Sequence, residues 1–134
     1  MPEVHRLSVR VYYEDTDFSG LVYHASYLRF FERGRTELLR DAGADQSVLH
    51  AGGQGLFFAV RRMTVDWLKP ARMDDVLTVE TRTVAVRGAT LDIGQRIVRD
   101  DVELVTATVL IAALVAGRPV RIPDHLRRMV GAAA

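Results

Sequence analysis

The sequence predicts an α+β fold in which one antiparallel sheet packs against one dominant helix. Apolar and polar residues alternate over residues 7–13, which is the period of a strand with one buried face. Apolar residues then recur at helical spacing over residues 25–41, and β-like segments with short breaks fill residues 57–115. This order of one strand, one long helix and a run of strands is typical of an α+β domain.

The first strand is expected from Leu7 to Tyr13. Residues 14–20 combine capping and turn residues, so the chain is expected to turn there. The helix is expected from about Ala25 to Asp41, with Gly43 as its stop signal. Gly34 stands in the apolar stripe of this helix at a cost of roughly 1 kcal/mol relative to alanine, which predicts close approach of the helix to the sheet.

Four further strands are expected after a glycine-rich connector over residues 52–55. They run over Phe57–Leu68, Val76–Val84, Thr90–Arg99 and Val102–Val115. Asp100-Asp101 and Arg87-Gly88 fit tight hairpin turns, so neighbouring segments are expected to pair antiparallel as a meander in one sheet.

The last of these segments is apolar on both faces over Val109–Val115, which predicts a strand covered on one side by the helix and on the other by another subunit. A short helix is the alternative, because a brief apolar run fits either period. Asp124 is expected to cap a final short helix that ends at about Met129.

The 134 residues are expected to form one domain over residues 1–134, because a chain of this length supports a single core. The absence of cysteine excludes disulfides, thiolate metal sites and a cysteine nucleophile. A net charge of +1 with scattered arginines argues against a nucleic-acid partner. No apolar run is long enough for a transmembrane segment and the N-terminus lacks the apolar stretch of a signal peptide, so a cytoplasmic location is expected.

Chemically active residue types are densest between Tyr13 and His24, where a strand end passes through a turn into a helix start. A helix N-terminus presents unpaired N–H groups and partial positive charge, which suit an oxygen that becomes negative during acyl transfer. A nearby carboxylate could activate water or attack directly. From spacing alone, however, Asp17 could equally be a turn or helix-cap residue.

The motifs of this region extend into the helix. They are Tyr13-Glu14-Asp15-Thr16-Asp17, Gly20, Val22-Tyr23-His24, Tyr27-Leu28 and Glu32-Arg33-Gly34-Arg35-Thr36-Glu37. They resemble those of the 4-hydroxybenzoyl-CoA thioesterase-like hotdog family, most closely its Tol-Pal-associated acyl-CoA thioesterase branch. The resemblance covers nearly the whole chain, including Lys69-Pro70 and the ending over residues 118–123. The chain departs from the family at Gly34, where many relatives have alanine, and at Phe18-Ser19, where proline or glycine often precedes Gly20.

The resemblance implies a hotdog fold, an antiparallel five-stranded sheet wrapped around one long helix. It assigns the catalytic carboxylate to Asp17, the bend of the approaching backbone to Gly20, and polarisation of the thioester carbonyl to the backbone N–H of His24, with its side chain as a further candidate. It also implies a homodimer or a tetramer of dimers, with acyl-CoA, or an acyl carrier protein thioester, bound along the subunit interface. No cofactor is implied.

Substrate contacts are expected from Tyr23 and from four cations. Arg61, Arg62, Lys69 and Arg72 are the candidates for the CoA phosphates, although each could equally be a solvated charge at a strand edge. The glycine-rich connector lacks the lysine and hydroxyl of a P-loop. The remaining histidines are too dispersed to predict a metal site.

The function expected from these residues is hydrolysis of an acyl-CoA to a free acid and CoA. Asp17 would act as general base on water or as nucleophile through a mixed anhydride, and both routes stay open. The alternatives are a hotdog dehydratase or hydratase acting on 3-hydroxyacyl thioesters, and a non-catalytic module that binds acyl-CoA or acyl carrier protein. Short-chain, long-chain and aromatic acyl groups all remain open.

Overall fold

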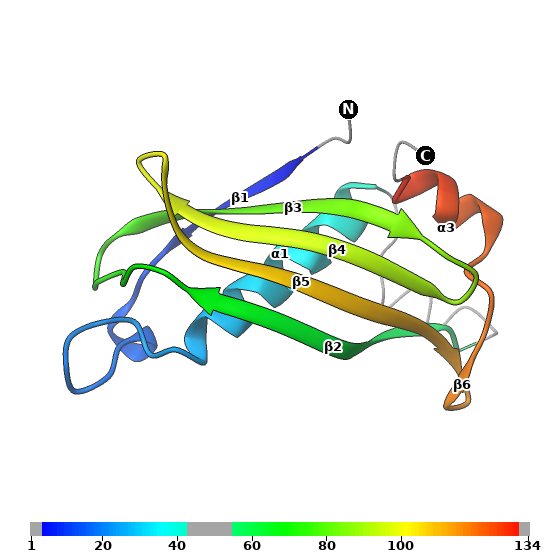
Figure 1. The fold of residues 1–134 in the computed structure, drawn as a ribbon, viewed down its shortest axis with the longest axis horizontal. Helices are drawn as coiled ribbons and strands as arrows, with labels where there is room; N and C mark the ends of the chain where they lie inside the picture. Colours follow the sequence, from blue (N-terminus) through cyan, green and yellow to red (C-terminus); the bar gives the residue numbers. More distant parts are fainter. Residues whose placement is uncertain (1–3, 43–54, 132–134) are drawn as a thin grey trace.

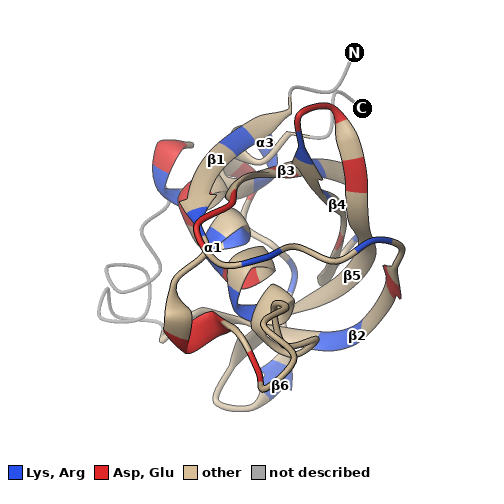
Figure 2. Ribbon diagram, turned by 90° about the vertical axis from the view of Figure 1, so that its left-hand side faces the viewer, with Lys and Arg blue, Asp and Glu red and all other residues tan. Residues whose placement is uncertain are grey.

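A computed structural model describes residues 4–42 and 55–131 of the chain. Its elements are β1 (His5–Arg10), the 3-10 helix η1 (Tyr13–Asp15), α1 (Ser26–Asp41), β2 (Phe57–Trp67), β3 (Val76–Val86), β4 (Thr90–Arg99), β5 (Val102–Val115), β6 (Arg118–Pro119) and α3 (Asp124–Met129). Five strands form an antiparallel sheet in the order β1-β3-β4-β5-β2, and the two-residue β6 adds to β5. The sheet curls around α1 (Figures 1 and 2), so the expected fold is confirmed. The glycine-rich connector and Gly43 lie outside the described residues.

The predicted first strand was too long at its C-terminal end. It ends at Arg10 rather than Tyr13, and Tyr13–Asp15 form η1 instead. The buried carboxylate of Asp15 accepts a hydrogen bond of 2.8 Å from the backbone N–H of Tyr12, which turns the chain out of the sheet. The alternating pattern continued past this turn, so periodicity alone could not reveal where the strand stops.

The predicted meander is correct for β3, β4 and β5 but wrong for β2. The Asp100-Asp101 hairpin has positive φ at both residues, 50° and 65°, as a tight primed turn requires. In contrast, β2 pairs with β5 at the far side of the sheet, while β3 pairs with β1. Residues 68–75 therefore cross from one side of the sheet to the other, and they do so past the start of α1. The alternative of a short helix over Val109–Val115 is wrong, because these residues pair in β5.

The core lies between α1 and the inner face of the sheet. Phe30 and Phe31 of α1 are fully buried among residues of β1, β3, β4 and β5. Gly34 makes the close approach that its position predicts, because a Cβ there would lie 2.7 Å from Thr81 Oγ1 and 2.8 Å from Val79 Cγ1. Both atoms belong to β-branched side chains that have little freedom to move aside.

Replacing Gly34 with alanine is expected to destabilise the protein by up to about 2 kcal/mol. Overpacking of a core costs roughly 1–3 kcal/mol, and the better helix propensity of alanine returns about 1 kcal/mol. Urea unfolding monitored by circular dichroism measures the difference. Gly88→Ala is the matched control, since a Cβ at Gly88 meets no atom within 4 Å. A raised stability of Gly34→Ala would contradict the close packing.

Candidate active site

Asp17 lies in a small closed turn between η1 and α1. The N–H of Asp17 donates to Leu21 O at 3.0 Å, and the N–H of Gly20 donates to Asp17 O at 3.0 Å. Gly20 has a φ of 84°, in the region that favours glycine. These bonds close the turn and leave the Asp17 side chain exposed to solvent.

The Asp17 carboxylate is held from one side by Ser19. Oδ1 accepts a hydrogen bond of 2.8 Å from the Ser19 N–H and one of 2.5 Å from the Ser19 hydroxyl. The side-chain and backbone bonds from Ser19 lower the pKa of Asp17, and the nearby His24 lowers it further. Asp17 is therefore a carboxylate at neutral pH, as a base or an oxygen nucleophile must be.

Backbone hydrogen bonds hold the Asp17 turn against the segment that follows β2. Leu21 forms a bridge with Arg72, and the Val22 N–H donates to Ala71 O at 2.9 Å. The Ala71 N–H in turn donates to the buried hydroxyl of Tyr27 in α1 at 2.9 Å. Residues about 50 positions apart in the chain thus meet at one end of the molecule, where the turn and the end of β2 lie together in Figure 1.

A cleft of about 330 Å³ opens between these segments. Its apolar walls are Leu21, Val22, Tyr27, Trp67, Leu68 and Pro70, and its polar groups are Asp17, Ser19, His24 and Lys69. An apolar cleft with a few convergent polar groups is the usual form of a small-molecule site. The cleft can therefore take an apolar group beside an ionised carboxylate.

His24 stands two residues before α1, at the mouth of the cleft. Its backbone N–H donates no hydrogen bond to any described residue, whereas its carbonyl accepts one of 3.1 Å from Trp67 Nε1. The imidazole packs against the rings of Tyr23 and Trp67, with centroids 4.4 and 5.9 Å away. This arrangement fixes the backbone while an N–H at the helix start remains available to a ligand oxygen.

The predicted phosphate contacts divide into two groups. Lys69 lines the cleft, and Arg72 is held next to the Asp17 turn by its bridge to Leu21. In contrast, Arg61 lies at an irregularity in β2, and Arg62 lines a separate hollow with residues of β3, β4 and β5. The structure does not bring Arg61 and Arg62 to Asp17 within one chain, so their role in binding CoA stays a prediction.

Sequence reasoning did not single out Ser19, Tyr27 or Trp67 as parts of the site. Ser19 follows Asp17 at the spacing of an Asx turn, which was the available signal. Trp67 is the single tryptophan and stands directly before Leu68-Lys69-Pro70. Tyr27 belongs to a motif shared with the family, but no role followed for it, because an aromatic residue at helical spacing indicates core packing as readily as a site.

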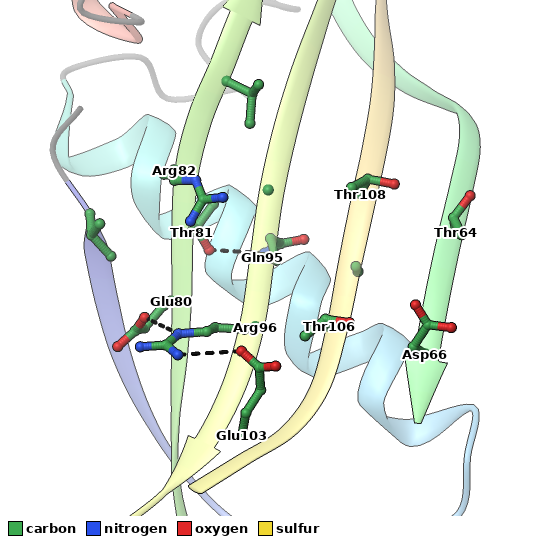
Figure 3. Close-up of a pocket in the computed structure, with 14 residues that line it drawn as sticks. Thr64, Asp66, Glu80, Thr81, Arg82, Gln95, Arg96, Glu103, Thr106 and Thr108 are labelled. Carbon is green, nitrogen blue, oxygen red and sulfur yellow. Dashed lines mark hydrogen bonds and ion pairs between the residues drawn. The ribbon is translucent and has the colours of Figure 1, made fainter. Parts of the chain in front are cut away.

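A larger hollow of about 420 Å³ lies on the face of the sheet that points away from α1 (Figure 3). Three of the charged side chains that line it pair with one another: Arg96 bonds to Glu80 at 2.6 Å and to Glu103 at 3.3 Å. Threonines from β2 and β5 complete its lining. We favour the smaller cleft as the active site, since it combines Asp17 with apolar walls and an available backbone N–H just before α1.

Positively and negatively charged residues are both scattered over the ribbon in Figure 2. Within residues 4–42 and 55–131, no group of three or more His, Asp or Glu side chains is placed to hold a metal ion. The same residues contain no helix that is long and apolar enough to cross a membrane.

Comparison with known proteins identifies the family. Residues 11–130 match the model of the thioesterase-like superfamily. The chain is 46% identical over 121 residues to an acyl-CoA thioesterase YbgC of Haemophilus influenzae, covering 89% of this chain and 88% of that protein. A probable thioesterase from Bartonella henselae superposes with a TM-score of 0.87 at 47% identity, over 90% of this chain and all of that one.

A Thermus thermophilus thioesterase complexed with coenzyme A and Zn superposes with a TM-score of 0.81 at 26% identity, over 93% of this chain and 90% of that one. Together with the extent of the family match, these similarities confirm the resemblance that the motifs indicate. The chain therefore belongs to the thioesterase-like superfamily.

Proposed function

We propose that the protein hydrolyses acyl-CoA thioesters to a free acid and CoA, with Asp17 as the catalytic carboxylate. The observation that carries this proposal is the ionised, exposed carboxylate of Asp17 in the same cleft as the available backbone N–H of His24. The names of the relatives support the same activity: acyl-CoA thioesterase for the protein of Haemophilus influenzae and acyl-CoA thioester hydrolase for that of Escherichia coli.

Two routes fit this arrangement. As a general base, Asp17 takes a proton from water while the water oxygen attacks the thioester carbonyl, and the C–S bond then breaks to release CoA thiolate, which recovers the proton. As a nucleophile, an Asp17 oxygen attacks the carbonyl, expels the thiolate and leaves a mixed anhydride that water hydrolyses. In both routes the carbonyl oxygen gains negative charge, which the N–H of His24 and the start of α1 stabilise.

From the residues that line the cleft we infer where each half of the substrate binds. The apolar side chains of Tyr27, Trp67 and Leu68 contact the acyl group, since burial of apolar surface favours their association. Lys69, the only lysine of the chain, meets an anionic group of CoA at the edge of the same cleft.

We also propose that the protein acts as a homodimer or a larger assembly. Among the described strands, β2 lies at the end of the sheet and pairs only with β5. At the end of β2, Trp67 and the following Leu68 line the cleft and are 47% and 54% exposed. A second copy of the chain would cover these side chains and complete the binding site. Light scattering on the purified protein tests this: a monomer mass at assay concentration would overturn it.

The cytoplasmic location stays a prediction.

The activity is tested by CoA-thiol release from acetyl-, butyryl-, benzoyl- and palmitoyl-CoA, with an acyl carrier protein thioester as a fifth substrate. Turnover of any of these supports the thioesterase and ranks the acyl groups. Hydration of an enoyl-CoA without thiol release would favour the dehydratase class instead. Tight binding of acyl-CoA without either reaction would identify a binding module and overturn the proposed activity.

A further inference from the structure

Both hydrogen bonds that the Asp17 side chain receives from another residue converge on one of its two carboxylate oxygens. The Ser19 N–H and hydroxyl both donate to Oδ1, at 2.8 and 2.5 Å. No hydrogen bond from another described residue reaches Oδ2. The two oxygens are therefore unequal before any substrate binds.

We propose that Ser19 is a positioning residue that fixes Oδ1 of Asp17 and leaves Oδ2 as the oxygen that attacks or takes the proton. This inference rests on the proposed thioesterase function and adds to it the oxygen that reacts and the residue that selects it. Ser19 itself touches Asp17 and not the reacting atoms. Its contribution therefore acts through the carboxylate.

The orientation of the Ser19 hydroxyl is fixed from its other side. Its oxygen accepts a hydrogen bond of 3.3 Å from the N–H of Leu21, so its own proton is directed to Asp17. Leu21 is held in turn by the bond from the Asp17 N–H to its carbonyl and by its bridge to Arg72. The chain of donors from Leu21 through Ser19 to Asp17 gives the carboxylate one orientation in an otherwise exposed turn.

The ionisable groups that share the cleft with Asp17 are His24, Tyr27 and Lys69. None of them donates a hydrogen bond to the Asp17 carboxylate, so Ser19 is the group that stabilises its charge by direct contact. Loss of the Ser19 hydroxyl therefore raises the pKa of Asp17. Because the reaction requires the carboxylate, activity is lost as the pH falls through this pKa, and the acid limb of the pH profile moves to higher pH when the hydroxyl is removed.

The test compares Ser19→Ala with Ser19→Thr, which keeps a hydroxyl, and with Ser8→Ala, the same change at an exposed position of β1. Ser19→Ala is expected to lower kcat about tenfold with little change in KM, and to move the acid limb of kcat/KM to higher pH. Ser19→Thr is expected to restore both, and Ser8→Ala to match the wild type. A purely structural role of Ser19 would lower activity without moving the acid limb and without rescue by threonine, and that result would overturn the inference.

A second measurement needs no substrate. Titration of the Asp17 carboxyl carbon by NMR reports its pKa in the free protein, and this pKa is expected to rise in Ser19→Ala and to stay at the wild-type value in Ser8→Ala. An unchanged Asp17 titration in Ser19→Ala would refute the contact directly. If the wild type hydrolyses no thioester, the proposed function fails, and the reactive-oxygen assignment fails with it, while the titration still decides whether Ser19 holds Asp17.

Discussion

Replacing Asp17 with asparagine is expected to lower kcat/KM for thioester hydrolysis by about 100- to 10,000-fold, the usual contribution of a positioned acid or base. An amide oxygen can still accept the hydrogen bonds from Ser19, so the turn keeps its shape while the group loses its charge. A neutral amide neither removes a proton from water nor attacks a carbonyl at neutral pH. Initial rates of CoA release, on protein whose circular dichroism matches the wild type, measure the loss.

Asp66→Asn is the matched control for this substitution. Asp66 is an exposed carboxylate in β2 that lines the hollow on the outer face of the sheet (Figure 3) and is not among the residues that line the cleft. The Asp66→Asn substitution removes the same charge. The kcat/KM of this variant is expected to stay within about twofold of the wild type, as is usual for surface changes. Equal turnover by Asp17→Asn and the wild type would contradict the catalytic role of Asp17.

Gln95→Leu is expected to destabilise the protein by about 2–4 kcal/mol, through loss of a buried polar network. Gln95 accepts a bond of 3.0 Å from the guanidinium of Arg35 and donates bonds of 2.9 Å to Phe31 O and Thr81 Oγ1. Gln95, Arg35 and Thr81 are all buried between α1 and the sheet. Burial lowers the pKa of Arg35, so this cation depends on its few polar partners. Urea unfolding measures the change.

A double-mutant cycle with Arg35→Met separates the network from ordinary packing. Gln95→Leu alone leaves the buried guanidinium without this acceptor, whereas Arg35→Met together with Gln95→Leu replaces both partners by apolar groups. The double variant is therefore expected to be more stable than Gln95→Leu alone. If the double variant were less stable than the wild type by the sum of the two single-variant losses, the two side chains would be energetically independent.

Local periodicity and turn residues were enough to predict most of the helices and strands. The bounds of β4 and β5 match the prediction because Asp100-Asp101 forms a tight turn that ends one strand and begins the next. The prediction of α1 started one residue early, at Ala25 rather than Ser26, and ended correctly at Asp41. The first strand was overextended because the Asp15 carboxylate ends it, and a single side-chain contact has no periodic signature.

The turn at residues 14–20 and the helix start after it were predicted from the sequence because their chemistry is local, whereas the role of Asp17 came from the family resemblance and Ser19 was not singled out. The strand order and the walls of the cleft were not predicted from the sequence. Pairing of β2 with β5, contact of Leu21 with Arg72, and the bond from Arg35 to Gln95 join residues 38 to 60 positions apart. Such contacts are selected by the burial of one shared core, which depends on all the elements at once, and so they emerge only when the whole chain is folded.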